Sequence, residues 1–250
     1  MDLQKLYSYV RRAVQDYNMI EEGDKIAIGI SGGKDSLTLL YALAGLRKFY
    51  PVKFDICAIT IELGWSKYNT ELVNDLSGVQ KLCDELGVEY HIIDTEIAPI
   101  VFGAREESNP CSLCAKLRKG ALNEEIKALG CNKVAYAHHK DDVVETMLLS
   151  LMYEGRFHTF APVTFLDKSM IHIIRPMIYV NESEVIGFVK KYNVPVTKSP
   201  CPVDGYTKRE YVHQVLKDLT KDNRDVKKRM FTAIVDSKLD GWDKENEAVY

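Results

Sequence analysis

The fold of this chain is decided by the stretch Ile26-Ala-Ile-Gly-Ile-Ser-Gly-Gly-Lys-Asp-Ser36. Its apolar first half predicts a buried strand, and apolar residues at helical spacing start directly after Ser36. Between the two, adjacent glycines let the backbone turn tightly and approach an anion without interference from a Cβ atom. The N-terminus of the following helix points unpaired N–H groups and its positive dipole end at the same spot. The stretch therefore predicts a cradle for a phosphate group.

The polar residues of this loop add to the cradle, because two serines bring hydroxyl donors and a lysine brings a positive charge. A Walker loop is excluded, since it needs four residues between its first glycine and the Gly-Lys-Ser/Thr end. The loop instead resembles the PP-loop of ATP pyrophosphatases, which cut ATP between the α and β phosphates. The alternative is an ordinary glycine-rich turn, which the match of all six positions disfavours. The predicted nucleotide-binding residues are Ser31, Gly32, Gly33, Lys34, Asp35 and Ser36.

Strand-like runs alternate with helical patterns along the whole chain. Strands are expected at 25–30, 53–61, 88–94, 132–137 and 171–175, and helices at 2–20, 36–49, 69–86, 113–129, 141–153, 181–192, 206–219 and 223–236. Two long connections are expected at about 95–112 and 155–170. This alternation predicts an α/β fold with a parallel sheet covered by helices on both faces, and ligands at the carboxyl ends of the strands. We expect one domain over 1–250, with an N-terminal helix over 2–20 and a basic helical segment over 206–236.

Composition and charge indicate the cellular compartment and the kinds of partner to expect. Apolar residues make up 46% of its 250 residues, and the formal net charge is −3. The charge is uneven, because residues 206–229 carry +4 and the rest of the chain carries −7. No apolar run reaches the length needed to span a membrane, so we expect a cytoplasmic protein without a membrane partner. Six cysteines in a reducing compartment favour metal binding or catalysis over disulfides.

Three of the cysteines form a candidate metal site. Cys111 and Cys114 open the helix expected at 113–129, and their spacing allows both sulfurs to reach one metal. Cys201 is the best third candidate, because it lies between two prolines and outside any periodic pattern. Three thiolates do not close a structural zinc site, but they suit a [4Fe–4S] cluster with one iron left open. Asp204 is either a weak fourth ligand or a surface aspartate.

The other three cysteines have a simpler interpretation. Cys57 is expected in a strand, Cys83 in a helix and Cys131 in a turn from a helix to a strand. Free cysteines in such places are most often small buried hydrophobic residues. We expect the same of these three.

With these motifs placed, the chain resembles the tRNA 2-thiocytidine synthetase family of PP-loop enzymes over about residues 20–236. The matching segments are Ser31–Ser36, Pro110–Gly120, His138–Asp142, Tyr153–Gly155, Ile174–Pro176 and Pro200-Cys201. The resemblance implies a Rossmann-like PP-loop ATP pyrophosphatase fold that binds ATP, Mg²⁺ and a [4Fe–4S] cluster on Cys111, Cys114 and Cys201. It implies that ATP is converted to AMP and pyrophosphate while sulfur replaces the C2 oxygen of an anticodon-loop cytidine, which is cytidine 32 in the family. Its implied partners are tRNA and a sulfur donor such as a cysteine desulfurase, and a homodimer is one option.

Several residues are candidates for the chemistry at the carboxyl edge of the sheet. Either Asp35 or Asp142 is expected to hold Mg²⁺, a hard cation that prefers oxygen ligands. Arg118 lies four residues after Cys114 on one helical face, so it is expected to stabilise either the adenylate or a phosphate of the substrate. The predicted catalytic residues are Asp35, Arg118, His138 and Asp142.

Other basic residues have an open interpretation. Lys116 and Lys119 fit a solvated helix face equally well, and Arg175 is a candidate phosphate contact. The basic segment 206–229 is expected to follow RNA phosphates, although such a charge run is often only a solvated face.

Three other functions remain open at this stage. The same machinery thiolates uridine in related enzymes, and Ala137 and Asp204 depart from the usual family pattern. A PP-loop ligase would adenylate a base and attack it with an amine, without needing the three cysteines together. A nucleotide or RNA sensor without turnover is disfavoured by the intact loop over Ser31–Ser36.

Overall fold

A mixed sheet forms the centre of the protein, in a computed structural model that describes residues 1–104, 110–202, 208–237 and 239–243. Its order is β3-β2-β1-β4-β6-β5. The strands are β1 (Asp24–Gly29), β2 (Phe54–Glu62), β3 (Glu89–Asp94), β4 (Lys133–Ala135), β5 (Val163–Leu166) and β6 (Ile171–Ile174). All neighbouring strands pair in parallel except β5, which pairs antiparallel with β6. The expected parallel sheet is thus confirmed with one correction at its edge.

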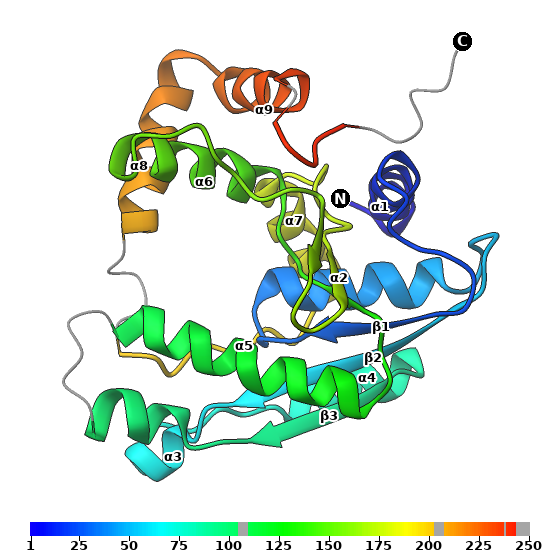
Figure 1. The fold of residues 1–250 in the computed structure, drawn as a ribbon, viewed down its shortest axis with the longest axis vertical. Coiled ribbons are helices and arrows are strands. Elements are labelled where there is room, and N and C mark those ends of the chain that lie inside the picture. The colour runs from blue at the N-terminus through cyan, green and yellow to red at the C-terminus, as the bar shows by residue number, and fades with distance from the viewer. Residues whose placement is uncertain (105–109, 203–207, 238, 244–250) are drawn as a thin grey trace.

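Helices cover both faces of the sheet. They are α1 (Leu3–Asp16), α2 (Lys34–Leu46), α3 (Trp65–Tyr68), α4 (Ser77–Leu86), α5 (Pro110–Ala128), α6 (Lys140–Tyr153), α7 (Glu182–Tyr192), α8 (Lys208–Asp222) and α9 (Val226–Asp236), and a π-helical turn, η1, spans Pro99–Ala104. Figure 1 shows α6, α8 and α9 grouped at one side of the molecule, apart from β1, β2 and β3. None of the described helices is long and apolar enough to cross a membrane.

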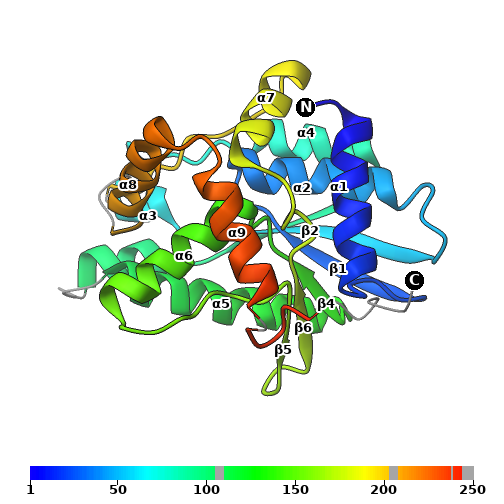
Figure 2. The same cartoon turned by 90° about the horizontal axis from the view of Figure 1, so that it is seen from above.

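Alternation along the strands divides the apolar core in two. Ile26 and Ile28 of β1 face the larger core, which also takes apolar residues from α1, α2, α4, α6, α7, α8 and α9. Ala27, between them, faces the smaller core, where Leu122 and Ile126 of α5 pack against the sheet. This is the period-two pattern of a strand buried on both faces. In Figure 2, α5 accordingly lies on one side of β1 and β2, while α1 and α2 lie on the other.

Several element boundaries differ from those expected from the sequence. The first helix ends at Asp16 rather than near residue 20, because Asn18 adopts a left-handed conformation with φ of +43°. Met19 and Ile20 remain buried beyond the helix end, so the apolar pattern continues where the helix does not. The helix expected from residue 69 begins at Ser77, because Asn69 and Asp75 accept backbone N–H groups two residues ahead and form turns.

The two long connections also contain structure that the sequence analysis did not predict. The first, 95–112, holds η1, and α5 begins at Pro110 rather than at residue 113. The second, 155–170, holds β5, which is four residues long and therefore too short for a clear periodic signal.

Candidate active site

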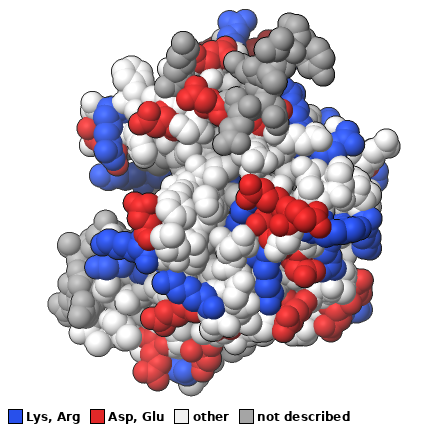
Figure 3. All heavy atoms as spheres, turned by 45° about the vertical axis from the view of Figure 1, so that its right-hand side comes forward, with Lys and Arg blue, Asp and Glu red and all other residues white. Residues whose placement is uncertain are grey.

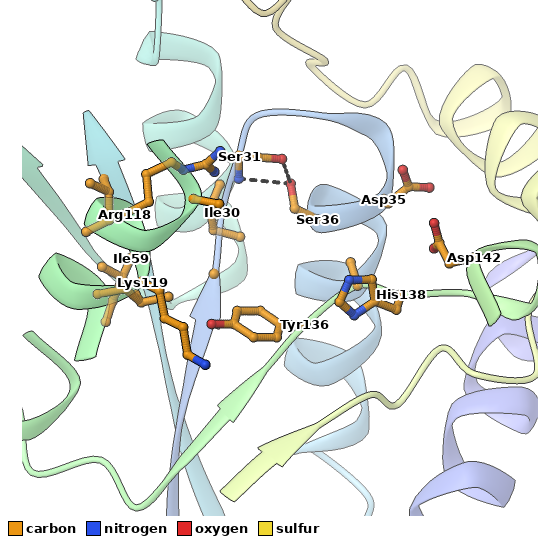
Figure 4. A pocket seen from close by; sticks show the side chains of 15 residues that line it. Ile30, Ser31, Asp35, Ser36, Ile59, Arg118, Lys119, Tyr136, His138 and Asp142 are labelled. Atoms are coloured by element: carbon orange, nitrogen blue, oxygen red, sulfur yellow. Dashed lines mark hydrogen bonds between the residues drawn. The ribbon is translucent and has the colours of Figure 1, made fainter. Parts of the chain in front are cut away.

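The loop after β1 makes the tight turn that its glycines predict. Gly32 has φ of +78°, a conformation that favours glycine. The backbone N–H of Ser31 donates to Ser36 Oγ over 3.2 Å, and Ser36 Oγ donates to the carbonyl oxygen of Gly33 over 3.0 Å. Figure 4 shows Ser31 and Ser36 joined in this way above the carboxyl end of β1. The two hydroxyls and the start of α2 therefore form one polar rim.

A segment distant in the sequence lies against this loop. The N–H of Thr197 donates to the carbonyl oxygen of Gly32 over 2.9 Å. A Cβ atom at Gly32 would lie 3.1 Å from the Cβ of Thr197, so a side chain there would be crowded as well as strained. The loop is thus held in place by the segment that leads to Cys201.

A cavity of about 500 Å³ opens beside the loop. Its wall comes from β1, β2, the start of α2, one face of α5 and the residues after β4 (Figure 4). It is lined by Gly29, Ile30, Ser31, Asp35, Ser36, Ile59, Ile61, Ala115, Arg118, Lys119, Leu122, Tyr136, Ala137, His138 and Asp142. The cavity is large enough for a nucleotide-sized ligand.

Helix α5 contributes a single stripe to this wall. Ala115, Arg118, Lys119 and Leu122 all line the cavity, and their spacing of three and four residues places them on one helical face. Cys114 lies four residues before Arg118, and Cys111 lies four before Ala115. The two cysteines therefore continue the stripe towards the N-terminus of the helix, where the dipole favours a thiolate.

The three candidate ligand cysteines lie near one another. Cys111 is exposed, while Cys114 and Cys201 are half-buried, and all three are free. Burial raises the pKa of Cys114, Arg118 opposes that effect, and the nearby thiols of Cys201 and Cys111 add to it. Among the described residues, no three His, Cys, Asp or Glu side chains are already packed closely enough to enclose a metal ion. Asp204 lies outside the described residues.

The start of α6 supplies the acidic part of the wall. His139 is buried and caps the helix, and its N–H donates to Asp142 Oδ2 over 2.9 Å. The ring of His139 also lies between two carboxylates, with Nε2 3.5 Å from Asp35 Oδ1 and Nδ1 3.3 Å from Asp142 Oδ2. Figure 4 shows the side chains of Asp35 and Asp142 next to each other at one end of the cavity.

Basic residues of α8 and α9 pair with the acidic residues of α6. Arg209 donates to Asp142 Oδ1 over 3.0 Å and lies 3.5 Å from Glu145. Lys227 donates to Asp141 Oδ1 over 2.8 Å. Burial would raise the pKa of Asp141, but hydrogen bonds from Lys227 and from the backbone of α7 hold it below its ordinary value. Two members of the predicted basic segment are therefore internal ion-pair partners.

His138 is held as a neutral ring. Burial, reinforced by the charge of Arg175, lowers the pKa of His138 to about 4. Arg175 Nε donates to His138 Nδ1 over 3.3 Å, which assigns the ring proton to Nε2. Phe160 stacks on the ring at 4.6 Å between centroids. His138 is therefore suited to donate a hydrogen bond in the cavity.

Comparison with known proteins identifies the family. The PP-loop domain family matches residues 5–219. A tRNA-cytidine(32) 2-sulfurtransferase of Geobacter metallireducens is 38% identical over 233 residues, covering 92% of this chain and 88% of the relative. One of Geobacter sulfurreducens is 37% identical over 236 residues, with the same coverage. This chain belongs to the tRNA-cytidine(32) 2-sulfurtransferase family of PP-loop proteins.

A solved structure confirms the fold of this sulfurtransferase family member. The U34-tRNA thiolase NcsA from Methanococcus maripaludis, determined with its [4Fe-4S] cluster, superposes with a TM-score of 0.74 and 24% sequence identity. The match covers 92% of this chain and 77% of that chain. The predicted Rossmann-like PP-loop fold is therefore confirmed.

Six of the twelve predicted site residues line one cavity: Ser31, Asp35, Ser36, Arg118, His138 and Asp142. Gly33 lines a neighbouring pocket of about 170 Å³, which shares Arg118 with the cavity and reaches Ser199 and Pro200. Lys34 does not line the cavity and instead forms ion pairs with Asp35 and Glu182, at 2.8 Å and 3.1 Å. Burial opposes the charge of Lys34, but these two carboxylates raise its pKa overall.

Other residues occupy places that the sequence did not predict. Arg175, expected at a phosphate, is buried and donates to His138 and to Thr164 Oγ1. Tyr136 in the wall and Arg209 on Asp142 were not predicted as part of the site. For Tyr136 the sequence did hold one indication, because the residue lies at the carboxyl end of an expected strand and such ends face the ligand.

The remaining three cysteines have the predicted role. Cys57, Cys83 and Cys131 are buried. The sulfurs of Cys57 and Cys131 lie 3.5 Å apart in the smaller core, beneath α5. Burial raises the pKa of Cys83, as expected for a thiol in an apolar helix face.

Proposed function

We propose that this chain adenylates the C2 oxygen of a tRNA cytidine with ATP and replaces that oxygen with sulfur. Its curated relatives are named for cytidine 32 of tRNA, and the same base is the proposed substrate. One observation carries the proposal: a single cavity has residues of the loop Ser31–Ser36 on one wall and the α5 stripe on another. Cys111 and Cys114 lie on the same face of α5, one turn closer to its N-terminus. Nucleotide activation and sulfur delivery can therefore share one reaction site.

The reaction has two balanced steps. The cytidine C2 oxygen attacks the α-phosphorus of ATP, and pyrophosphate leaves. Sulfide then adds to C2, the C2–O bond breaks, and AMP leaves with the original oxygen. Adenylation is needed because the C2 carbonyl is a poor electrophile and its oxygen is a poor leaving group.

The residues of the cavity have distinct roles in this scheme. Ser31, Ser36 and the first N–H groups of α2 bind the pyrophosphate end of ATP. Arg118 neutralises the phosphate of the adenylate, and neutral His138 donates a hydrogen bond from Nε2. These assignments keep the positive charge on α5 opposite the starts of α2 and α6, which hold Asp35 and Asp142.

Two carboxylates are proposed to hold Mg²⁺. Asp35 and Asp142 lie on either side of His139, within 3.5 Å and 3.3 Å of its ring nitrogens. Mg²⁺ is commonly bound by one or two carboxylates together with phosphate oxygens. The pair therefore suits the metal ion of an ATP complex.

The cysteine donor set fits a [4Fe–4S] cluster. Three free thiols from two chain segments lie near one another, one of them at the N-terminus of α5. When bound, such a cluster would supply the site from which sulfur is transferred. Cys111, Cys114 and Cys201 would hold it, and a cysteine desulfurase would restore the sulfur. A homodimer, a cytoplasmic location and a single domain over 1–250 also remain proposals.

The reaction can be tested with purified protein under anaerobic conditions, with ATP, tRNA and sulfide. We expect AMP, pyrophosphate and 2-thiocytidine, the last identified by mass spectrometry of tRNA nucleosides. Asp35→Asn should lower the rate about 100-fold, because it removes one carboxylate from the metal site. Asp75→Asn, an exposed aspartate outside the cavity, is the matched control.

Each alternative function gives a different product in this assay. ADP and phosphate would contradict the PP-loop assignment. A thiolated uridine would redirect the proposal to another base. An amine-modified base without iron would indicate a ligase.

The tRNA is proposed to dock along the outer side of α8 and α9. Arg209 and Lys227 are engaged with α6, so they are poor probes of this surface. Other basic side chains there are exposed, and four of them serve as probes: Lys217, Arg224, Lys228 and Arg229. Figure 3 shows Lys and Arg side chains gathered on both sides of a hollow in the surface.

Replacing these four with Gln should weaken tRNA binding and flatten its salt dependence. The slope of log affinity against log salt should change by about 0.7–0.9 for each RNA phosphate that the protein no longer neutralises. ATP binding should stay unchanged, because the nucleotide site lies at the loop after β1. The control variant replaces four exposed lysines elsewhere: Lys48, Lys53, Lys81 and Lys168. An unchanged slope in the test variant would show that α8 and α9 present only a solvated face.

A further inference from the structure

The two oxygens of the Asp142 carboxylate are held in different ways. Oδ2 accepts the N–H of His139 over 2.9 Å, which is part of the cap of α6 and belongs to the fold. Oδ1 is 3.0 Å from a guanidinium nitrogen of Arg209, which comes from a different helix. Since Asp142 lines the cavity, Oδ1 is the oxygen that can be exchanged between a protein partner and a ligand.

Arg209 is placed so that it can leave this oxygen. Its side chain is 44% exposed, and it lies in the first turn of α8 beside exposed Lys208. A guanidinium binds phosphate in a two-pronged geometry that a single carboxylate oxygen does not offer. An RNA phosphate near α8 would therefore compete well with Asp142 for Arg209.

The other two partners of Arg209 do not need it. Thr146 Oγ1 accepts a hydrogen bond from Arg209 over 3.2 Å, and this residue is partly exposed, so water can replace the guanidinium. Glu145 is buried, with its side chain 7% exposed, and Arg209 lies 3.5 Å away. His213 lies closer, with Nδ1 2.8 Å from Glu145 Oε1. When Arg209 leaves, Glu145 retains the hydrogen bond to His213, so the movement does not leave a buried carboxylate without a partner.

We propose that Arg209 occupies Asp142 Oδ1 in the RNA-free protein, and that an RNA phosphate at the first turn of α8 draws Arg209 away and frees this oxygen for the Mg²⁺ of the nucleotide. The inference rests on the proposed function, because it takes Asp142 as a metal ligand and RNA as the substrate. Its consequence is that the site binds metal–nucleotide well only when RNA is present. ATP is then not cleaved before the base to be modified has arrived.

Metal binding tests this directly, without relying on turnover. Mn²⁺ replaces Mg²⁺, α,β-methylene-ATP replaces ATP, and bound Mn²⁺ is measured by electron paramagnetic resonance with and without a saturating anticodon stem–loop RNA. In the wild type, RNA should tighten Mn²⁺ binding about fivefold, the size expected for releasing a half-exposed ion pair. Arg209→Gln should bind Mn²⁺ tightly without RNA and respond no further to it.

Two matched variants separate this role from a general effect of charge. Arg209→Lys keeps a cation next to Asp142, so it should retain the RNA dependence. Lys221→Gln also removes one positive charge from α8, but Lys221 pairs with Asp218 within that helix and should behave as the wild type. A second readout is the hydrolysis of ATP by water to AMP and pyrophosphate without RNA, which Arg209→Gln alone should raise about fivefold.

The outcomes distinguish the inference from the function on which it rests. If Arg209→Gln binds Mn²⁺ more weakly than the wild type, or still responds to RNA, Arg209 only positions Asp142 and the inference is wrong. Tight Mn²⁺ binding by the wild type without RNA also overturns the inference but leaves the proposed function intact. If the wild type binds no Mn²⁺–nucleotide complex even with RNA, both are overturned.

Discussion

The two helices that border the candidate site, α5 and α6, differ in whether their charged residues form ion pairs. On α6, Asp141, Asp142 and Glu145 each have a basic partner from α8 or α9. On α5, Arg118 and Lys119 are exposed to the cavity and have no ion pair among the described residues. Paired carboxylates are held in place by protein partners, of which only Arg209 on Asp142 is proposed to leave, whereas unpaired cations gain their partner from the ligand. A preorganised acidic wall therefore faces a basic wall that is completed by substrate.

The largest expected effect concerns the three candidate cluster cysteines, two of which lie at the start of α5. Cys201→Ala should abolish both iron binding and thiolation, because Cys111 and Cys114 alone leave the proposed cluster one ligand short. Iron and acid-labile sulfide analysis, together with nucleoside mass spectrometry, measures both. Cys83→Ala is the control, since Cys83 is a buried thiol in α4. Full iron content in Cys201→Ala would show that Cys201 is not a ligand and would contradict the proposed three-cysteine cluster.

A pair of substitutions tests the difference between the two walls. Arg118→Gln should lower kcat/KM about 10- to 100-fold, the loss expected for one hydrogen bond to a charged group, with little change in stability. Asp141→Asn should mainly affect stability. It should lower the free energy of unfolding by about 2 kcal/mol, because it breaks a buried pair with Lys227. Steady-state kinetics and urea unfolding of both variants measure the two effects. If Arg118→Gln destabilises the fold as much as Asp141→Asn does, the proposed difference between the walls is wrong.

Near neutral pH the smallest expected effect comes from His138, on the α6 side of the cavity, because its contribution grows only as the pH falls. Its pKa is about 4 in the folded protein and near 6.5 in an unfolded chain. Between these values only the unfolded state binds the proton, so stability falls as the pH drops from 6.5 towards 4. At pH 4, protonation of His138 in the unfolded state lowers the free energy of unfolding by about 3 kcal/mol.

Urea unfolding of wild type and His138→Asn across that range measures this contribution. Asn keeps an acceptor for Arg175 but cannot be protonated, so the variant should lack this part of the pH dependence. Equal slopes in the two proteins would mean that His138 has the same pKa in the folded and the unfolded state. The pairing with Arg175 would then not belong to the preorganised wall.

Local patterns predicted most of the fold and about half of the site. The loop over Ser31–Ser36, the sheet and the α5 stripe follow from residue type and spacing, because strand and helix periods determine which residues share a face. The end of α1 and the start of α4 were missed for a local reason, since Asn and Asp side chains there form turns inside an apolar pattern. Strand β5 was missed because it pairs with only one neighbour and is short.

The partners of the charged residues could not be predicted, because they come from distant segments. Nothing in the spacing of Arg209 indicates that it pairs with Asp142, or that Lys227 pairs with Asp141, across 67 and 86 positions. Arg175 was expected to face a phosphate, yet the fold buries it against His138. A charge run in a sequence records how many charges are present but not which of them are neutralised.

The sequence by itself determined the kind of chemistry: a glycine-rich loop between a strand and a helix, and cysteines at a helix start, act through backbone geometry and residue type within a few positions. Only the tertiary structure decided which groups remain available for a ligand. The packing of α8 and α9 on α6 neutralises one set of charges, while the open face of α5 leaves another unpaired among the residues that the structure describes. The physical reason is that an ion pair depends on distances of a few ångströms in space, and those distances exist only after the chain has folded.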